Sequence, residues 1–294
     1  MSKHIISGHL NLSPDDLLPA SKEEKESLIV MRQSVSFWQD GFRRLLKNKV
    51  ALASLAVFII ILILAFIVPI FYPYNYATQI QGSERLLPMQ YSASELTRIS
   101  AGEHIFPHIL GTDSLGRDYA IRVMMGARIS LIVGLLASFI VLIIGSIYGS
   151  VAAFTGGWVD LIMMRIVDII YTVPDILLII LLTFALKKPM KLLANAPGFG
   201  WINVLGINLI SIFVVFALLY WVGMARIVRG QILVLKEQEY VTAARALGAK
   251  SGQIIRKHLL TNTIGTLIVT TTLQIPSAIF TESYLSFLGL GVAV

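Results

Sequence analysis

The sequence predicts an all-α protein, a bundle of helices that crosses a membrane several times. Hydrophobic residues make up 56% of its 294 residues and charged residues only 14%, and the mean hydropathy is +0.77. Soluble domains usually contain about 45–50% apolar residues. Apolar runs of about 20 residues, the length that crosses a bilayer as a helix, recur along the chain. These observations indicate a polytopic transmembrane helical bundle.

The residues before the first apolar run are polar and carry charges of both signs. We expect this segment, residues 1–49, to be cytoplasmic and to remain in the mature protein. Its last part, up to about Asn48, can form an amphipathic helix on the membrane surface, and its basic residues 43–49 can bind anionic lipid. The apolar positions of that helix are Phe37, Trp38, Phe42, Leu45 and Leu46.

Five membrane spans are expected. Residues 50–71, 129–154 and 201–225 contain no charge, residues 166–186 contain only two aspartates, and residues 259–280 are diluted by threonines. Pro174 should kink the third span. With a cytoplasmic N-terminus, the external segments are 72–127 and 187–200. About two thirds of the 24 Lys and Arg residues then lie on the cytoplasmic side, as the positive-inside rule requires. The three lysines in 187–200 are exceptions, because they lie on the external side.

Ionisable residues at membrane depth are functional candidates by default. Asp175 could face a translocation path. Glu282 follows the fifth apolar run, where contact with a substrate or an outer gate and a structural pair within the bundle are equally good interpretations. Asp160 is expected to cap the third span, and Arg165 and Asp168, three residues apart, to pair on the helix surface.

One charged, alanine-rich stretch, "EYVTAARALGAKSGQIIRKHLL" at residues 239–260, differs from the apolar runs. It predicts a short cytoplasmic helix, a bend and a second helix capped by Ser251. Glu239 lies where the helix dipole favours an acid, and Gly248 can end the helix in a left-handed conformation. The periodicity leaves open an ordinary surface helix packed on its own protein. Its narrow apolar face, at positions i, i+3, i+4 and i+7, consists of Tyr240, Ala243, Ala244 and Leu247.

Several functions are excluded by missing residues. The stretch "GAKSG" lacks the glycine spacing of a phosphate-binding loop, so we expect no ATP hydrolysis in this chain. No cysteine is present for a disulfide or a thiolate metal site. His104 and His108 have helical spacing, but Pro107 breaks a helix there, and we expect no metal site. Membrane topology explains the net charge of +7 better than nucleic-acid binding does.

Several motifs resemble a known family of transporters. The residues "EYVTAARALG", followed by "IIRKHLL" and Asn262, resemble the cytoplasmic EAA loop of ABC importer permeases. The stretches "FRRLLKNKVALASL", "HILGTDSLGRD", "GARISL", "GGWVD…MMRIVDIIYTVPDILL" and "ESYLSFLGLG" resemble the second (C-type) permease subunit of the oligopeptide, dipeptide and nickel branch. These matches keep their order from about residue 40 onward. Thr261 stands where the family usually has proline, and the family pattern continues into a sixth span that would follow Val294.

The resemblance implies a permease domain, residues 50–294, in which a coupling loop, residues 237–258, docks into an ATP-binding subunit. Its contact residues would be those of the apolar face, together with Glu239 and Gly248. The implied partners are a homologous permease subunit, two ATP-binding subunits that carry ATP and Mg, and an extracellular or periplasmic substrate-binding protein. This chain itself would hold no cofactor and would lie in a bacterial or archaeal cell membrane.

The resemblance also suggests a cargo and an external surface. Peptide is the expected cargo, with nickel or another solute as the alternative. The residues Gly111, Asp113, Gly116 and Arg117 are expected to shape the external mouth or to contact the binding protein. A different interpretation is a self-contained, ion-coupled transporter or channel. We find no internal repeat of the kind that such transporters usually contain.

Overall fold

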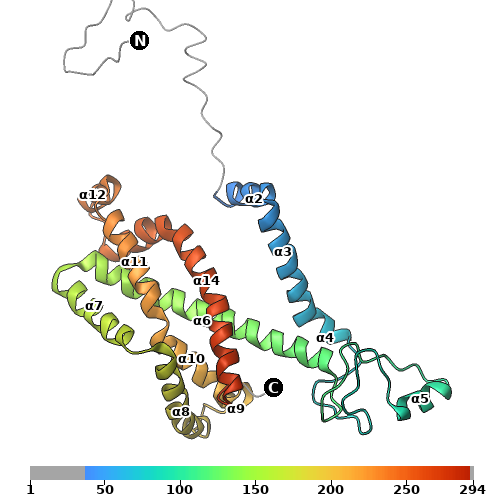
Figure 1. The fold of residues 1–294 in the computed structure, drawn as a ribbon. Coiled ribbons are helices and arrows are strands. Elements are labelled where there is room, and N and C mark those ends of the chain that lie inside the picture. The colour runs from blue at the N-terminus through green and yellow to red at the C-terminus, as the bar shows by residue number, and fades with distance from the viewer. Residues whose placement is uncertain (1–36, 292–294) are drawn as a thin grey trace, which may run out of the picture. The chain divides into compact units, whose positions relative to one another are not determined.

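The computed structural model describes residues 37–291, apart from the side chains of Phe37, Trp38 and Val204, and every regular element in that range is helical (Figure 1). The predicted all-α class is therefore confirmed. The chain divides into two compact units, with a boundary after Ile60. The division expected after residue 49, between a cytoplasmic segment and a permease domain, stays a prediction. Most of the expected cytoplasmic segment, residues 1–36, lies outside the described residues.

The described part of the first unit consists of α2 (Phe37–Lys47) and the start of α3 (Lys49–Leu62). α2 is the helix expected before Asn48, and Phe42 on it is exposed. The side-chain oxygen of Asn48 accepts hydrogen bonds from the N–H groups of Val50 and Ala51, at 3.1 and 3.2 Å. Asn48 thereby caps the start of α3 and separates the two helices. The place of α2 on the membrane surface stays a prediction.

By length and composition, four helices in the described residues can cross a membrane: Lys49–Phe71, Tyr119–Thr155, Ile207–Leu235 and Ser251–Phe287. The first of these comprises α3, a π-helical turn η2 (Ile63–Ile67) and α4 (Val68–Phe71). A fifth candidate is the pair α7 (Gly157–Thr172) and α8 (Asp175–Ala194), which bend by 89° at their break. The five expected spans thus correspond to four helices and one bent pair.

The bend between α7 and α8 has a local cause. Pro174 occupies the N-cap position of α8, and Val173 before it is extended, with a ψ of 135°, as a residue before proline prefers. The kink expected at Pro174 is therefore a complete break of the helix. Lys187, Lys188 and Lys191, expected in an external loop at 187–200, belong to α8 instead.

Two other boundaries differ from expectation. α6 (Tyr119–Thr155) begins well before residue 129, because the Asp118 carboxylate accepts a hydrogen bond from the N–H of Ile121 at 3.0 Å and caps the helix early. The expected span 201–225 is divided into α9 (Trp201–Leu205), α10 (Ile207–Leu219) and α11 (Trp221–Leu235), with Gly206 at a φ of 93° between the first two.

The C-terminal part contains α12 (Glu239–Ala246), α13 (Ser251–Ile254), a π-helical turn η3 (Ile255–Leu259) and α14 (Leu260–Phe287). The expected cap by Ser251 is wrong, because Lys250 is the N-cap residue and no side chain caps α13. The Thr261 hydroxyl donates to the carbonyl of Arg256 at 3.2 Å. The π-helical turn η3 widens the helix just before Thr261, the position at which the family pattern has proline.

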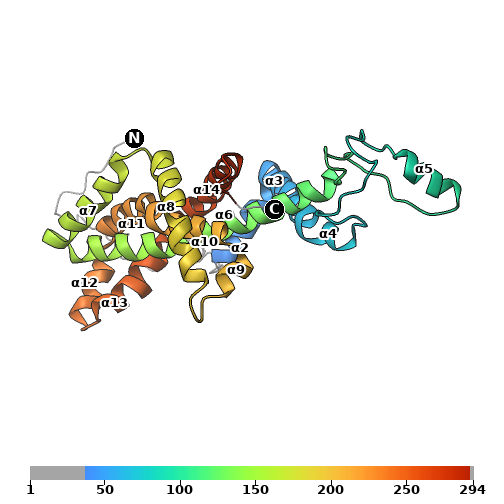
Figure 2. The same ribbon diagram turned by 90° about the horizontal axis from the view of Figure 1, so that it is seen from below.

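α6 is the central helix of the second unit, in contact with α7, α10, α11 and α14, and it runs beside α11 in both views (Figures 1 and 2). Two glycines one turn apart permit this approach. A Cβ atom at Gly145 would lie 2.6 Å from the Cβ of Met224, and one at Gly149 would overlap the carbonyl oxygen of Ala225. Small residues at this spacing let helices pack closely in lipid, where van der Waals contact drives their association.

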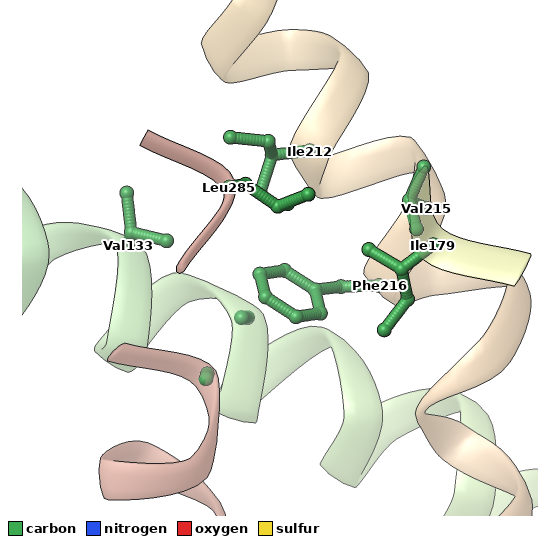
Figure 3. Close-up of a cluster of buried hydrophobic side chains, with 8 residues drawn as sticks. Val133, Ile179, Ile212, Val215, Phe216 and Leu285 are labelled. Carbon is green, nitrogen blue, oxygen red and sulfur yellow. The ribbon is translucent and has the colours of Figure 1, made fainter. Parts of the chain in front are cut away.

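A cluster of buried hydrophobic side chains joins α6, α8, α10 and α14 (Figure 3). The ring of Phe216, 1% exposed, points into the middle of this cluster. Val133 and Leu285 contribute from α6 and α14, and Ile179 contributes from α8. The cluster therefore fixes the second half of the bent pair against the rest of the bundle.

Candidate functional site

The segment expected to dock a partner is the short helix α12 with the bend that follows it. Gly248 has a φ of 82°, its N–H bonds to the carbonyl of Arg245 at 2.9 Å, and the N–H of Ala249 bonds to the carbonyl of Ala244 at 3.1 Å. These two bonds form a Schellman motif, which requires a left-handed residue where Gly248 stands. The predicted left-handed end of the helix is confirmed.

α12 is held to the bundle by Val241, which the sequence analysis did not single out. Its side chain is fully buried in a cluster with Val228 and Ile232 of α11 and Ile254 of α13. Val241 could not be predicted as a buried residue, because α12 has only two turns and a single apolar residue outside the predicted face does not produce a helical periodicity. Part of the alternative interpretation, packing on its own protein, therefore applies to this side of the helix.

The predicted apolar face lies mostly on the surface. Leu247 is 88% exposed and Tyr240 39%, and Ala243 is exposed as well. Ala244 is half-buried and packs against the Val241 cluster. Leu247, Tyr240 and Ala243 together form a small exposed apolar surface that no other part of the described residues buries.

Polar contacts fix the orientation of α12. The Lys236 ammonium donates to the carbonyl of Ala153 at 3.1 Å, and the Arg245 guanidinium carbon lies 4.9 Å from the ring centroid of Phe154. The Asn262 amide donates to the Tyr240 hydroxyl at 3.2 Å. Arg245 thus ties α12 to the end of α6, Tyr240 ties it to the start of α14, and Lys236 ties the turn before α12 to α6, so a displacement of α12 would act on both helices.

Asp175 lies at the bend between α7 and α8, where it is exposed and lines a cavity of about 500 Å³. Residues of α7, α8, α10, α11 and α14 form the walls together with the turns between them, among them Tyr171, Tyr220, Gln274 and Ser277. This position is compatible with the predicted translocation path, which stays a prediction.

Glu282 does not line this cavity. It is 4% exposed, and its two carboxylate oxygens accept hydrogen bonds from Ser130 of α6 at 2.9 Å and from Ser286 at 2.8 Å. Of the two interpretations open for Glu282, this geometry is that of a structural pair within the bundle.

The aspartates of α7 have partners other than those expected. Asp160 does not cap the helix. Its carboxylate accepts two hydrogen bonds from the Arg229 guanidinium, each of 2.6 Å. Asp168 pairs with Arg226 at 2.7 Å rather than with Arg165. Both pairs join α7 to α11, and no periodicity along α7 could indicate partners on another helix.

The structure brings the four expected residues of the external mouth together in one tight loop. The Asp113 carboxylate accepts hydrogen bonds from the N–H groups of Leu115 and Arg117, at 2.8 and 3.0 Å, and from the Arg117 side chain at 2.7 Å. Burial raises the pKa of Asp113, but these hydrogen bonds outweigh it and hold that pKa below its usual range. Gly111 and Gly116 have positive φ and approach the backbone of residues 80–87 closely. A role in docking stays a prediction.

Behind this loop lies a group of buried ionisable side chains that was not predicted. His108 is fully buried; its Nδ1 lies 2.8 Å from a carboxylate oxygen of Asp118, and its Nε2 lies 3.1 Å from one of Glu95. The Tyr74 ring stacks on the imidazole with centroids 4.4 Å apart. A doubly protonated imidazole would donate to both carboxylates. In sequence, only the S-x-x-E spacing of Ser92 and Glu95 signals part of this group, as the capping box of α5 (Ala93–Ser100).

The two carboxylates influence the neighbouring groups. Burial by itself raises the pKa of Glu95, but hydrogen bonds from the Ser92 backbone and from His108 outweigh it, and the net pKa is lowered. Burial and the negative charges of Glu95 and Asp118 raise the pKa of Tyr74 to about 12. In the described residues, no group of three or more His, Asp or Glu side chains has the geometry to hold a metal ion.

Two family models match the chain. Residues 142–294 match the binding-protein-dependent transport system inner membrane component, and residues 36–88 match the N-terminal TM domain of oligopeptide transport permease C. The first match contains α12, the cavity and both α7–α11 ion pairs, while the second contains α2 and α3.

Curated relatives match over most of their length. The dipeptide transport system permease protein DppC of Bacillus subtilis is 42% identical over 283 residues, which cover 96% of this chain and 78% of that protein. The oligopeptide transport system permease protein OppC of the same organism is 38% identical over 282 residues, covering 96% and 81%. OppC of Escherichia coli is 36% identical over 256 residues, covering 87% and 74%.

Proposed function

Because the chain belongs to the family of binding-protein-dependent transport system inner membrane components, we propose that it is the permease subunit of an importer driven by ATP in separate partner subunits. The observation that carries this proposal is α12, a short helix with an exposed apolar face on a bend fixed by Gly248. Such a helix fits a groove on an ATP-binding subunit, because Ala243 lets the partner backbone approach closely.

Peptides are the proposed cargo. The similar proteins of Bacillus subtilis and Escherichia coli are named as dipeptide and oligopeptide transport permeases. The cavity of about 500 Å³ beside Asp175 has the size of a small-molecule site, which is typically about 300–1,000 Å³. We place the translocation path along this cavity. The carboxylate of Glu282 is occupied by hydrogen bonds from Ser130 and Ser286. In this proposal Glu282 affects the path only by holding α14 in position.

The coupling follows from the contacts of α12. ATP binding closes the partner subunits and displaces α12. The displacement reaches α6 through Arg245, and through Lys236 in the turn before α12, and it reaches α14 through Asn262. To move an equilibrium between inward and outward openings from 1:99 to 99:1 requires about 5.5 kcal/mol of differential binding. The ATP-binding subunits would supply this free energy, with ATP and Mg held there.

The remaining partners cover the other surfaces. The helix Ser251–Phe287 has only 11% of its apolar window buried, so it offers apolar area to lipid or to a homologous permease subunit. The loop around Asp113 would face the extracellular or periplasmic binding protein. With α12 and the N-terminus cytoplasmic, residues 72–118 lie outside a bacterial or archaeal cell.

A paired substitution on α12 tests this proposal. Ala243→Trp places bulk on the predicted docking face, whereas Thr242→Trp places the same bulk on an exposed position outside that face. Ala244 is the poorer probe, because it packs on the chain's own core. In proteoliposomes that contain the complete transporter, we expect Ala243→Trp to abolish ATP-driven peptide uptake and to weaken co-purification with the ATP-binding subunits. Thr242→Trp should retain both.

Two outcomes would contradict the proposal. Uptake at the wild-type rate by the Ala243→Trp complex would show that α12 does not dock through this face. Uptake by the purified chain alone, driven by an ion gradient without ATP, would support the self-contained transporter instead.

A further inference from the structure

The cavity at the break between α7 and α8 has a distinctive charge. Asp175 is the one charged residue among its lining residues, which otherwise include the hydroxyl and amide side chains of Tyr171, Tyr220, Gln274 and Ser277. No ion pair within residues 37–291 involves Asp175. One of its carboxylate oxygens accepts a hydrogen bond from the N–H of the next residue, Ile176, at 2.8 Å. The carboxylate therefore keeps acceptor capacity toward the cavity.

The end of α7 adds further acceptors. Tyr171, Thr172 and Val173 line the cavity where α7 stops. The last carbonyl groups of a helix lack partners within the helix and form its negative end. The break thus brings the negative end of α7 to the cavity beside Asp175, whose carboxylate offsets the positive N-terminal end of α8. Broken membrane helices are a common source of transporter binding sites.

Neighbouring contacts hold the aromatic walls in place. The guanidinium carbon of Arg226, which is paired with Asp168, lies 4.3 Å from the ring centroid of Tyr171. The hydroxyl groups of Tyr220 and Thr281 are 2.6 Å apart. Since Arg226 belongs to α11, the element that leads to α12, the wall formed by Tyr171 is linked to the predicted docking helix.

We infer that this cavity binds the protonated α-amino group of a transported peptide, with Asp175 as the specificity-determining residue. The inference rests on the proposed peptide-transport function. A single carboxylate among hydroxyl and amide groups matches one ammonium, which donates three hydrogen bonds. A divalent metal ion would need a larger set of carboxylate or imidazole ligands than this lining provides.

Two variants and two probes test the inference. Asp175→Asn removes the charge at constant size, and Asp175→Glu retains it. Asp40→Asn is the control, because it removes an exposed carboxylate of α2 outside the cavity. The probes are trialanine and N-acetyltrialanine, whose amino terminus carries no charge. Their binding is measured by calorimetry on the detergent-solubilised transporter without its binding protein, and ATP-driven uptake of trialanine is measured in proteoliposomes.

We expect the wild type and Asp40→Asn to bind trialanine about tenfold more tightly than its acetylated form, as one charge-assisted contact predicts. Asp175→Asn should bind both probes equally, and Asp175→Glu should recover part of the preference. Retention of the full preference by Asp175→Asn, equal binding by the wild type, or uptake by a wild type that binds neither probe would overturn the inference. Failure of the wild type to take up peptide with ATP would instead refute the proposed function.

Discussion

At the scale of single residues, Gly149 sets the distance between α6 and α11. A Cβ atom there would overlap the carbonyl of Ala225, while one at Gly126 on the same helix would meet nothing within 4 Å. We expect Gly149→Ala to destabilise the protein by about 1–3 kcal/mol through overpacking. Gly126→Ala should be neutral or stabilising by up to about 1 kcal/mol, because alanine favours the helix. Thermal unfolding of the purified complex measures both, and an unchanged midpoint for Gly149→Ala would contradict the packing argument.

The group around His108 predicts a dependence on pH at the same scale. The pKa of Glu95 is lower in the folded protein than its usual value of 4.5. Its carboxylate therefore contributes stability that is present above pH 4.5 and is lost as the pH falls through the lowered pKa. Hydrogen–deuterium exchange of residues 83–118 should show protection near neutral pH that decreases in acid.

Matched variants isolate the contribution of Glu95. Glu95→Gln should lose protection at neutral pH and show a weaker dependence on acid. Glu103→Gln changes an exposed carboxylate of the same external segment and should behave as the wild type. An identical acid response in Glu95→Gln and the wild type would show that other groups determine it.

At the scale of an element, the bend after α12 depends on one backbone conformation. Gly248 has a φ of 82° and open space around it, so Gly248→Ala introduces strain of about 1–2 kcal/mol without a steric clash. Gly252, in α13, also has open space but a helical backbone. We expect Gly248→Ala to reduce co-purification with the ATP-binding subunits and ATP-driven uptake, and Gly252→Ala to retain both. Equal behaviour of the two variants would mean that the conformation at Gly248 is not needed.

At the scale of the whole molecule, the orientation in the membrane can be tested because the chain contains no cysteine. Gln90 lies in the external segment and Thr242 on α12, and both are exposed. A membrane-impermeant maleimide should label Gln90→Cys on intact cells and Thr242→Cys only after permeabilisation. Labelling in the reverse pattern would show that the orientation in the membrane is the opposite one and that α12 is not cytoplasmic.

The sequence by itself determined the features that depend on neighbouring residues. Apolar runs indicated the four membrane-length helices and the bent pair, Pro174 a kink that is a complete break in the structure, and Gly248 the left-handed end of α12. These features could be predicted because helix length, a missing N–H and a positive φ are properties of the local chain. The family resemblance, carried by ordered motifs, was likewise confirmed by the matching family models.

Only the tertiary structure decided which side chains meet. Asp160 pairs with Arg229, 69 residues away, and Asp168 with Arg226, 58 residues away, in place of the local roles expected for them. The two carboxylates around His108 are only 10 and 13 residues away, and Val241 packs on the neighbouring α11 and α13, but these contacts too depend on how separate elements fold together. Periodicity along one helix shows which residues share a face, but the partner of that face is set by how the helices pack.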